Sequence, residues 1–163
     1  MPTAVRSPAS VAVLALLAAP LLGAADTIAP PRLAGELLGG TSGIEPGVAA
    51  EFLLPVQPVI CLRPEFFVWD GYRPGVGIAG LWHVPFALPP GHDFAIGPRV
   101  AFHDGAQHDD PHAEVDALGI YTFPIIPSQP GHHHIEIITA LGVLDKDGAT
   151  IGASVGAGYA YSF

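Results

Sequence analysis

The chain has 163 residues, including 20 glycines and 18 prolines, with 15 acidic residues against 6 basic ones and one cysteine. This length suits one domain, and so many turn formers argue against a helical fold. The acidic excess repels phosphate backbones and so argues against a nucleic-acid partner, while the single cysteine excludes an intramolecular disulfide or a multi-cysteine metal site. We expect Cys61 to be a buried, inert thiol.

The N-terminus has the order of a secretory signal peptide. Arg6 precedes an apolar stretch from Val11 to Leu17, Pro20 follows, and small residues lead to Ala25. This order predicts cleavage after Ala25, with residues 1–25 removed and residues 26–163 forming one domain. An uncleaved anchor is less favoured, because the apolar stretch falls short of the roughly 20 residues that a spanning helix needs.

The remainder of the chain consists of segments in which apolar residues occupy every second position. This period of two predicts β-strands. In chain order the predicted strands cover residues 32–38, 44–54, 62–68, 76–86, 94–103, 114–125, 134–144 and 151–163. Eight strands of about ten residues predict an all-β fold, an eight-stranded antiparallel up-and-down transmembrane β-barrel, whose interior is filled by side chains.

The second face of these segments carries small or charged residues, which suit a narrow barrel interior. The charged residues assigned to it are Glu45, Glu51, Arg63, Glu65, Arg99, Asp116 and Glu136. If the second and third strands turn near Gln57, Glu51 lies opposite Arg63, and a loop centred between residues 107 and 108 places Arg99 opposite Asp116. Directly opposed side chains are close in antiparallel strands, so we predict two buried ion pairs. A narrow ion path is the less favoured reading of these charges.

The last segment carries a resemblance to a known family. Ile151, Ala153, Val155, Ala157, Tyr159, Tyr161 and Phe163 alternate with small or polar residues. This segment resembles the terminal strand of bacterial outer-membrane barrels, and the size and alternation of the mature chain are similar to the OmpA-type and OmpX-type eight-stranded barrels. The resemblance implies the outer membrane of a Gram-negative cell envelope, contact with its lipid, and recognition of the C-terminal strand by the barrel-assembly machinery. It implies no particular task.

Barrel topology places short external loops at residues 39–43, 70–74, 104–112 and 145–148. Four prolines, Pro46, Pro64, Pro98 and Pro124, lie inside predicted strands and count against a barrel, since each removes a ladder hydrogen bond. A secreted soluble β-sandwich is therefore the main alternative fold.

Two histidine-rich clusters contain residue types that bind metals. His103, Asp104, His108, Asp109, Asp110, His112 and Glu114 offer metal ligands in one predicted external loop, but their spacing matches no tight motif and a solvated polar loop is favoured. His132, His133 and His134 cannot all bind one ion, because adjacent strand residues point to opposite faces; we place them at the periplasmic rim.

A lipid-modifying enzyme would need a nucleophile beside a base. The mature serines are Ser42, Ser128, Ser154 and Ser162, and none lies in a nucleophile elbow. We therefore expect a monomeric, non-enzymatic outer-membrane barrel with a structural, surface-interaction or minor-pore role and no catalytic, cofactor-binding or metal residues. The alternatives are a soluble β-sandwich protein and, less favoured, a lipid-modifying outer-membrane enzyme.

Overall fold

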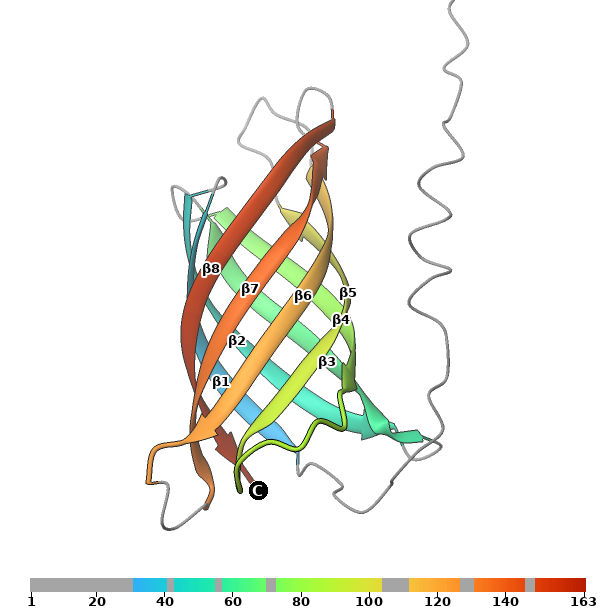
Figure 1. The fold of residues 1–163 in the computed structure, drawn as a ribbon. Helices are drawn as coiled ribbons and strands as arrows, with labels where there is room; N and C mark the ends of the chain where they lie inside the picture. Colours follow the sequence, from blue (N-terminus) through green and yellow to red (C-terminus); the bar gives the residue numbers. More distant parts are fainter. Residues whose placement is uncertain are drawn as a thin grey trace, which may run out of the picture.

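The fold is a single β-sheet closed on itself (Figure 1). A computed structural model describes residues 31–40, 43–54, 57–69, 73–103, 112–126, 131–145 and 149–163. Its strands are β1 (Arg32–Gly40), β2 (Gly43–Leu54), β3 (Gln57–Trp69), β4 (Arg73–His83), β5 (Asp93–His103), β6 (His112–Pro124), β7 (His133–Asp145) and β8 (Ala149–Ser162).

Every strand pairs antiparallel with its neighbours in the chain, and β1 pairs with β8 to close the sheet. The eight-stranded antiparallel barrel is therefore confirmed. The β-sandwich alternative is wrong, because a sandwich has two separate sheets with free edges, whereas these eight strands form one closed sheet. No helix in the described part of the chain is long and apolar enough to cross a membrane. The predicted signal peptide, residues 1–25, lies outside the described residues.

Alternation along the strands sorts side chains between two environments. Among the described strand side chains, every Asp, Glu and Arg occupies an inward-facing position, including Arg63 and Glu136 at 0% exposure. Outward positions carry large apolar groups, such as Val48 at 53% exposure, Leu141 at 60% and Ile151 at 75%. This arrangement is inverted relative to a water-soluble protein, in which charged groups face outward.

The prolines within strands are accommodated by one-sided pairing. Pro46 is paired with Leu37 of β1, but the β2–β3 register begins only at the next residue. Pro98 is paired with Ala117 of β6, while the β4–β5 register skips its position. Proline has no backbone N–H, so it loses a hydrogen-bond donor toward only one of its two neighbouring strands. The ladder to the other neighbouring strand therefore continues. Pro64 behaves in the same way, and Pro124 ends β6.

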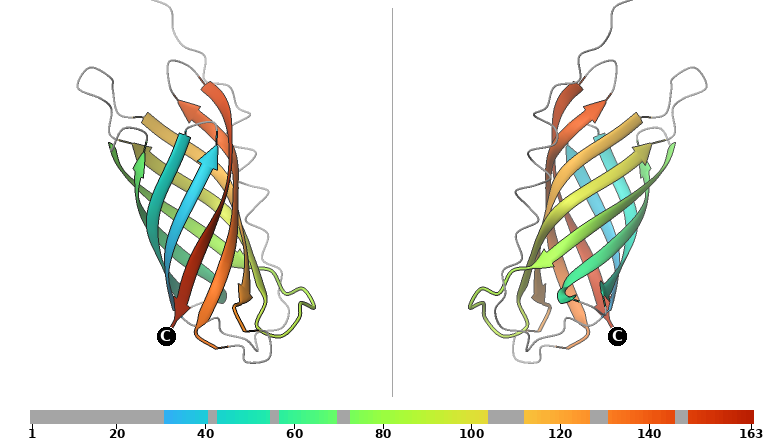
Figure 2. Two further views of the ribbon diagram at one scale, coloured as in Figure 1. Left: turned by 90° about the vertical axis from the view of Figure 1, so that its left-hand side faces the viewer. Right: turned by 90° about the vertical axis from the view of Figure 1, so that its right-hand side faces the viewer.

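The connection from β4 to β5 departs from the predicted strand. Alternation predicts a strand that continues to Phe86, but β4 ends at His83 and residues 84–92 form a connection. Pro85 cannot donate to a ladder, and two hydrogen bonds of 2.8 Å instead close three-residue turns within residues 84–88. Gly91, at φ 79°, completes the turn. This connection extends beyond the strands at the end of the barrel where the chain terminates (Figure 2).

Candidate functional site

The polar feature that dominates the molecule is a network of ion pairs inside the barrel. Arg63 of β3 is fully buried and forms close ion pairs with Glu36 of β1 and Glu51 of β2. It also lies 3.0 Å from Glu136 of β7, across the interior, and 3.5 Å from Glu65 on its own strand. One guanidinium group thus joins four strands.

A second centre forms around Arg99 of β5. Its Nε donates to Asp116 at 2.5 Å, and its terminal nitrogens lie 3.3 Å from Glu65 and 3.5 Å from Glu114. Glu65 contacts both Arg63 and Arg99, so the two centres form one network. Both predicted ion pairs, Glu51–Arg63 and Arg99–Asp116, are confirmed.

The third centre lies near the end of the barrel where the chain terminates. Arg32, the first residue of β1, donates to Asp93 at 3.0 Å and to Thr122 at 3.3 Å, and lies 3.6 Å from Glu51. Asp93 also contacts His83 Nδ1 at 2.8 Å. Strands from opposite sides of the barrel are therefore tied together here as well.

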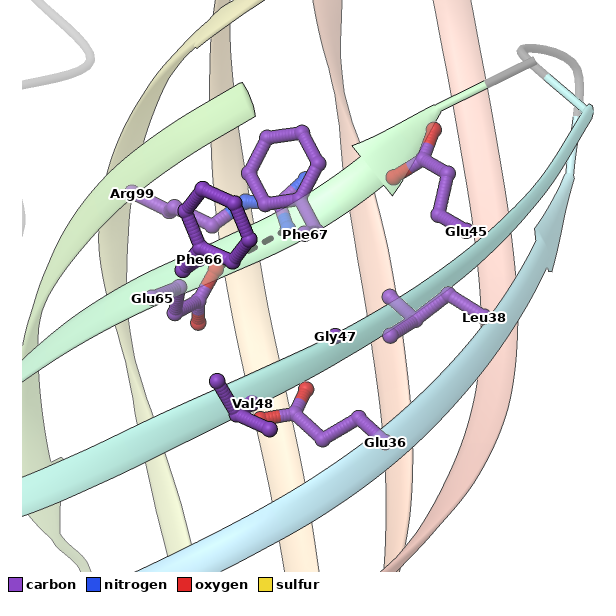
Figure 3. A pocket seen from close by; sticks show the side chains of 9 residues that line it. All are labelled: Glu36, Leu38, Glu45, Gly47, Val48, Glu65, Phe66, Phe67 and Arg99. Carbon is purple, nitrogen blue, oxygen red and sulfur yellow. Dashed lines mark hydrogen bonds and ion pairs between the residues drawn. The ribbon is translucent and has the colours of Figure 1, made fainter. Parts of the chain in front are cut away.

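These side chains fill the interior at their level. Figure 3 shows Glu65 and Arg99 joined beside a small cavity that Glu36, Glu45 and Phe67 also line. The cavity has a volume of about 10 Å³, room for about one water molecule. At this level the side chains of the described strands form a polar plug.

The plug contains more carboxyl groups than guanidinium groups. Eight acidic side chains surround three arginines, Arg32, Arg63 and Arg99; the acids are Glu36, Glu45, Glu51, Glu65, Asp93, Glu114, Asp116 and Glu136. The interior therefore favours positive charge over negative charge.

The predicted histidine-rich external loop belongs in part to the strands. His103 is the last residue of β5, and His112 and Glu114 belong to β6, so all three lie on the barrel wall and are buried. His103 Nε2 lies 3.2 Å from Glu114, and its ring packs 5.1 Å from that of Phe67. Strand pairing continues to the His103–His112 pair, which explains the correction. Asp104, His108, Asp109 and Asp110 lie outside the described residues.

The three adjacent histidines take opposite faces, as predicted. His134 is buried at the start of β7, whereas His132 and His133 are exposed. His133 Nδ1 lies 2.5 Å from the Tyr159 hydroxyl, and His132 Nδ1 lies 2.6 Å from the carbonyl oxygen of Ser162. These contacts hold the end of β8 against β7.

The described serines occupy interior positions. Ser162 is 2% exposed, and its hydroxyl has no hydrogen-bond partner among the described residues. Ser154 is half-buried at an inward position. Ser42 and Ser128 lie outside the described residues. Cys61, on the inward face of β3, is 1% exposed, which confirms the expected buried thiol.

Comparison with known proteins yields a likeness in structure alone. No protein-family model matches the chain, and no curated protein matches it in sequence. Among solved structures, the crystal structure of Neisserial surface protein A, an eight-stranded outer-membrane β-barrel, is similar with a TM-score of 0.52 at 10% sequence identity. The match covers 82% of this chain and 94% of that protein. The chain thus shares the fold of that protein, a closed eight-stranded antiparallel barrel.

Proposed function

We propose that this chain is a non-enzymatic β-barrel protein of the Gram-negative outer membrane, with a structural or surface-interaction role. The observation that carries the proposal is the distribution of charge. Every described acidic or arginine side chain of the strands faces inward, and the outward face is largely apolar. Exposure of such an apolar surface to water is unfavourable, whereas its contact with lipid is favourable.

Aromatic residues near one end of the barrel support the same proposal. Trp, Tyr and Phe favour the boundary between lipid and water, where they form girdles around membrane barrels. Ring pairs at the end where the chain terminates are Phe86–Phe94, Tyr121–Phe123 and Tyr161–Phe163. This end is then the periplasmic boundary, and the loops at the other end face the cell exterior.

The polar plug favours a structural or surface role over a minor pore. Buried charges that satisfy one another inside a narrow barrel obstruct water and ions. Arg63, at 0% exposure, stands at the centre of this obstruction. The barrel then serves to hold its short external loops at the surface, with residues 1–25 directing secretion and the C-terminal strand directing assembly.

Cell fractionation tests this proposal. Expressed as the whole chain in a Gram-negative host, the protein should be recovered with outer membranes, and intact mass should correspond to cleavage after Ala25. Ala25→Arg, which blocks the small position that the peptidase requires, should accumulate the uncleaved chain and serve as the control. Recovery of the cleaved protein in the soluble periplasm without detergent would refute the proposal.

A further inference from the structure

Three potential metal ligands from three adjacent strands converge inside the barrel. They are Glu51 of β2, Cys61 of β3 and His83 at the end of β4. A carboxylate oxygen, the thiol sulfur and a ring nitrogen all lie within 4.8 Å of one another. Ligands of one tetrahedral zinc ion are about 3.5 Å apart, given bonds of about 2.0–2.3 Å. Side-chain shifts of about 1 Å would therefore close this group around an ion.

The histidine is held in the orientation that a metal ligand needs. His83 Nδ1 lies 2.8 Å from the Asp93 carboxylate, and its Nε2 is buried without a hydrogen-bond partner among the described residues. A carboxylate that accepts from one ring nitrogen fixes the tautomer and leaves the other nitrogen free to bind metal. A buried nitrogen without a partner is costly in a folded protein, and a bound ion would satisfy it.

The local charges are compatible with a divalent cation. A thiolate and a carboxylate together balance two positive charges, and a carboxylate has about four lone-pair sites. Glu51 can thus keep its contacts with Arg63 and Arg32 while it binds an ion. These guanidinium groups oppose a cation, but the plug around them contains more carboxylates than guanidiniums.

The group lies toward one end of the barrel, with its histidine nearest to solvent. His83 ends β4 and Asp93 begins β5, and their side chains are 11% and 21% exposed. Cys61 and Glu51, at 1% and 4%, lie deeper. An ion would therefore meet His83 first and then the thiol and carboxylate.

We propose that Glu51, Cys61 and His83 form a binding site for a transition-metal ion of the zinc class, with Asp93 as the residue that positions His83. Thiolate with imidazole selects such ions over magnesium or calcium, which prefer oxygen ligands. On binding, the Cys61 thiol loses its proton to solvent and sulfur bonds to the metal. A tetrahedral ion would take its fourth ligand from water.

Cobalt, a spectroscopic substitute for zinc, tests the site in the purified barrel in detergent after chelator treatment. Because Cys61 is the only cysteine, a thiolate-to-cobalt charge-transfer band reports cobalt bound at this site. Cobalt bound to other histidines alone would not produce the band. We expect one equivalent of cobalt to produce the band and zinc to abolish it. Cys61→Ser and His83→Gln should lose the band, whereas His92→Gln, a control histidine that contacts Tyr121, should keep it.

Asp93→Asn separates a positioning role from ligation. It should keep the band but weaken cobalt affinity by about tenfold or more, the usual effect of removing such a carboxylate. Should the Cys61 or His83 variants fail to fold, X-ray absorption of the unmodified protein with bound zinc decides the question. A sulfur neighbour at about 2.3 Å supports the site. Zinc bound only through nitrogen and oxygen, or no binding at low-micromolar zinc, would overturn it.

Discussion

Arg99 shows how one residue can depend on several partners. It contacts Asp116, Glu65 and Glu114 within the barrel. Removing one member of a buried pair leaves an uncompensated charge and costs roughly 3–5 kcal/mol. Arg99→Ala should therefore strongly lower the urea midpoint of detergent-refolded protein.

The double variant is the sharper test of this network. Adding Asp116→Ala to Arg99→Ala should recover part of the lost stability, since one of the stranded carboxylates is removed. Recovery should be incomplete because Glu65 and Glu114 remain. Arg73→Ala, at the half-buried start of β4, should cost less and serves as the control. Fully additive losses from Arg99→Ala and Asp116→Ala would show that the two side chains are not coupled.

At the scale of one strand, the end of β8 secures the closing seam. The Phe163 amide donates to the Pro31 carbonyl at 3.1 Å, and its ring packs 5.3 Å from that of Tyr161. Phe163→Ser should lower the folded fraction in the membrane while secretion continues, because both seam packing and the predicted assembly signal are weakened. Gel mobility with and without heating measures the folded fraction.

Phe86→Ser is a matched control for that variant. Phe86 is also an exposed aromatic near the same end, at 63% against 69% for Phe163, but it lies in the β4–β5 connection. Its replacement should leave folded yield nearly unchanged. If the two variants behave alike, the end of β8 has no special part in assembly.

The strands and their inward faces could be predicted because alternation reports burial directly. Register symmetric about Gln57 and about residues 107 and 108 then identified both ion pairs. The turn predicted near Gln57 is wrong, because Gln57 begins β3 opposite Leu54 and a register shift between Leu53 and Leu54 produces the pairing beyond it. The end of β4 could not be placed, since the apolar pattern runs on through Pro85 to Phe86 while the hydrogen bonds stop. The group of Glu51, Cys61 and His83 was also missed. Each residue alone is unremarkable in sequence, and their approach depends on the register and curvature of three strands.

At the scale of the whole molecule, we expect the outer surface of the barrel to contact lipid. Leu141, midway along β7 and 60% exposed, should lie near the bilayer centre. Leu141→Arg should destabilise the barrel in phospholipid vesicles by about 2–4 kcal/mol, as a charge at the midplane does.

A substitution near the end of the barrel provides the control for Leu141→Arg. Ile126, 54% exposed just beyond the end of β6, should tolerate Ile126→Arg at a cost of about 0–1 kcal/mol, because charge near the interface stays hydrated. Denaturant titrations of the two variants in the same vesicles give the comparison. Equal stability of Leu141→Arg and Ile126→Arg would argue against a lipid-facing wall.

The arginine contacts also act as spokes across the barrel's cross-section. Arg32 reaches Thr122, 90 residues away in the chain, and Arg63 reaches Glu136, 73 residues away. These bonds join β1 to β6 and β3 to β7, strands that are not neighbours in the sheet, so they stabilise the curled, closed cylinder and not an open, flat sheet. They therefore hold the cylinder round and slow its reopening, while the rate at which it first closes is left to the strands themselves.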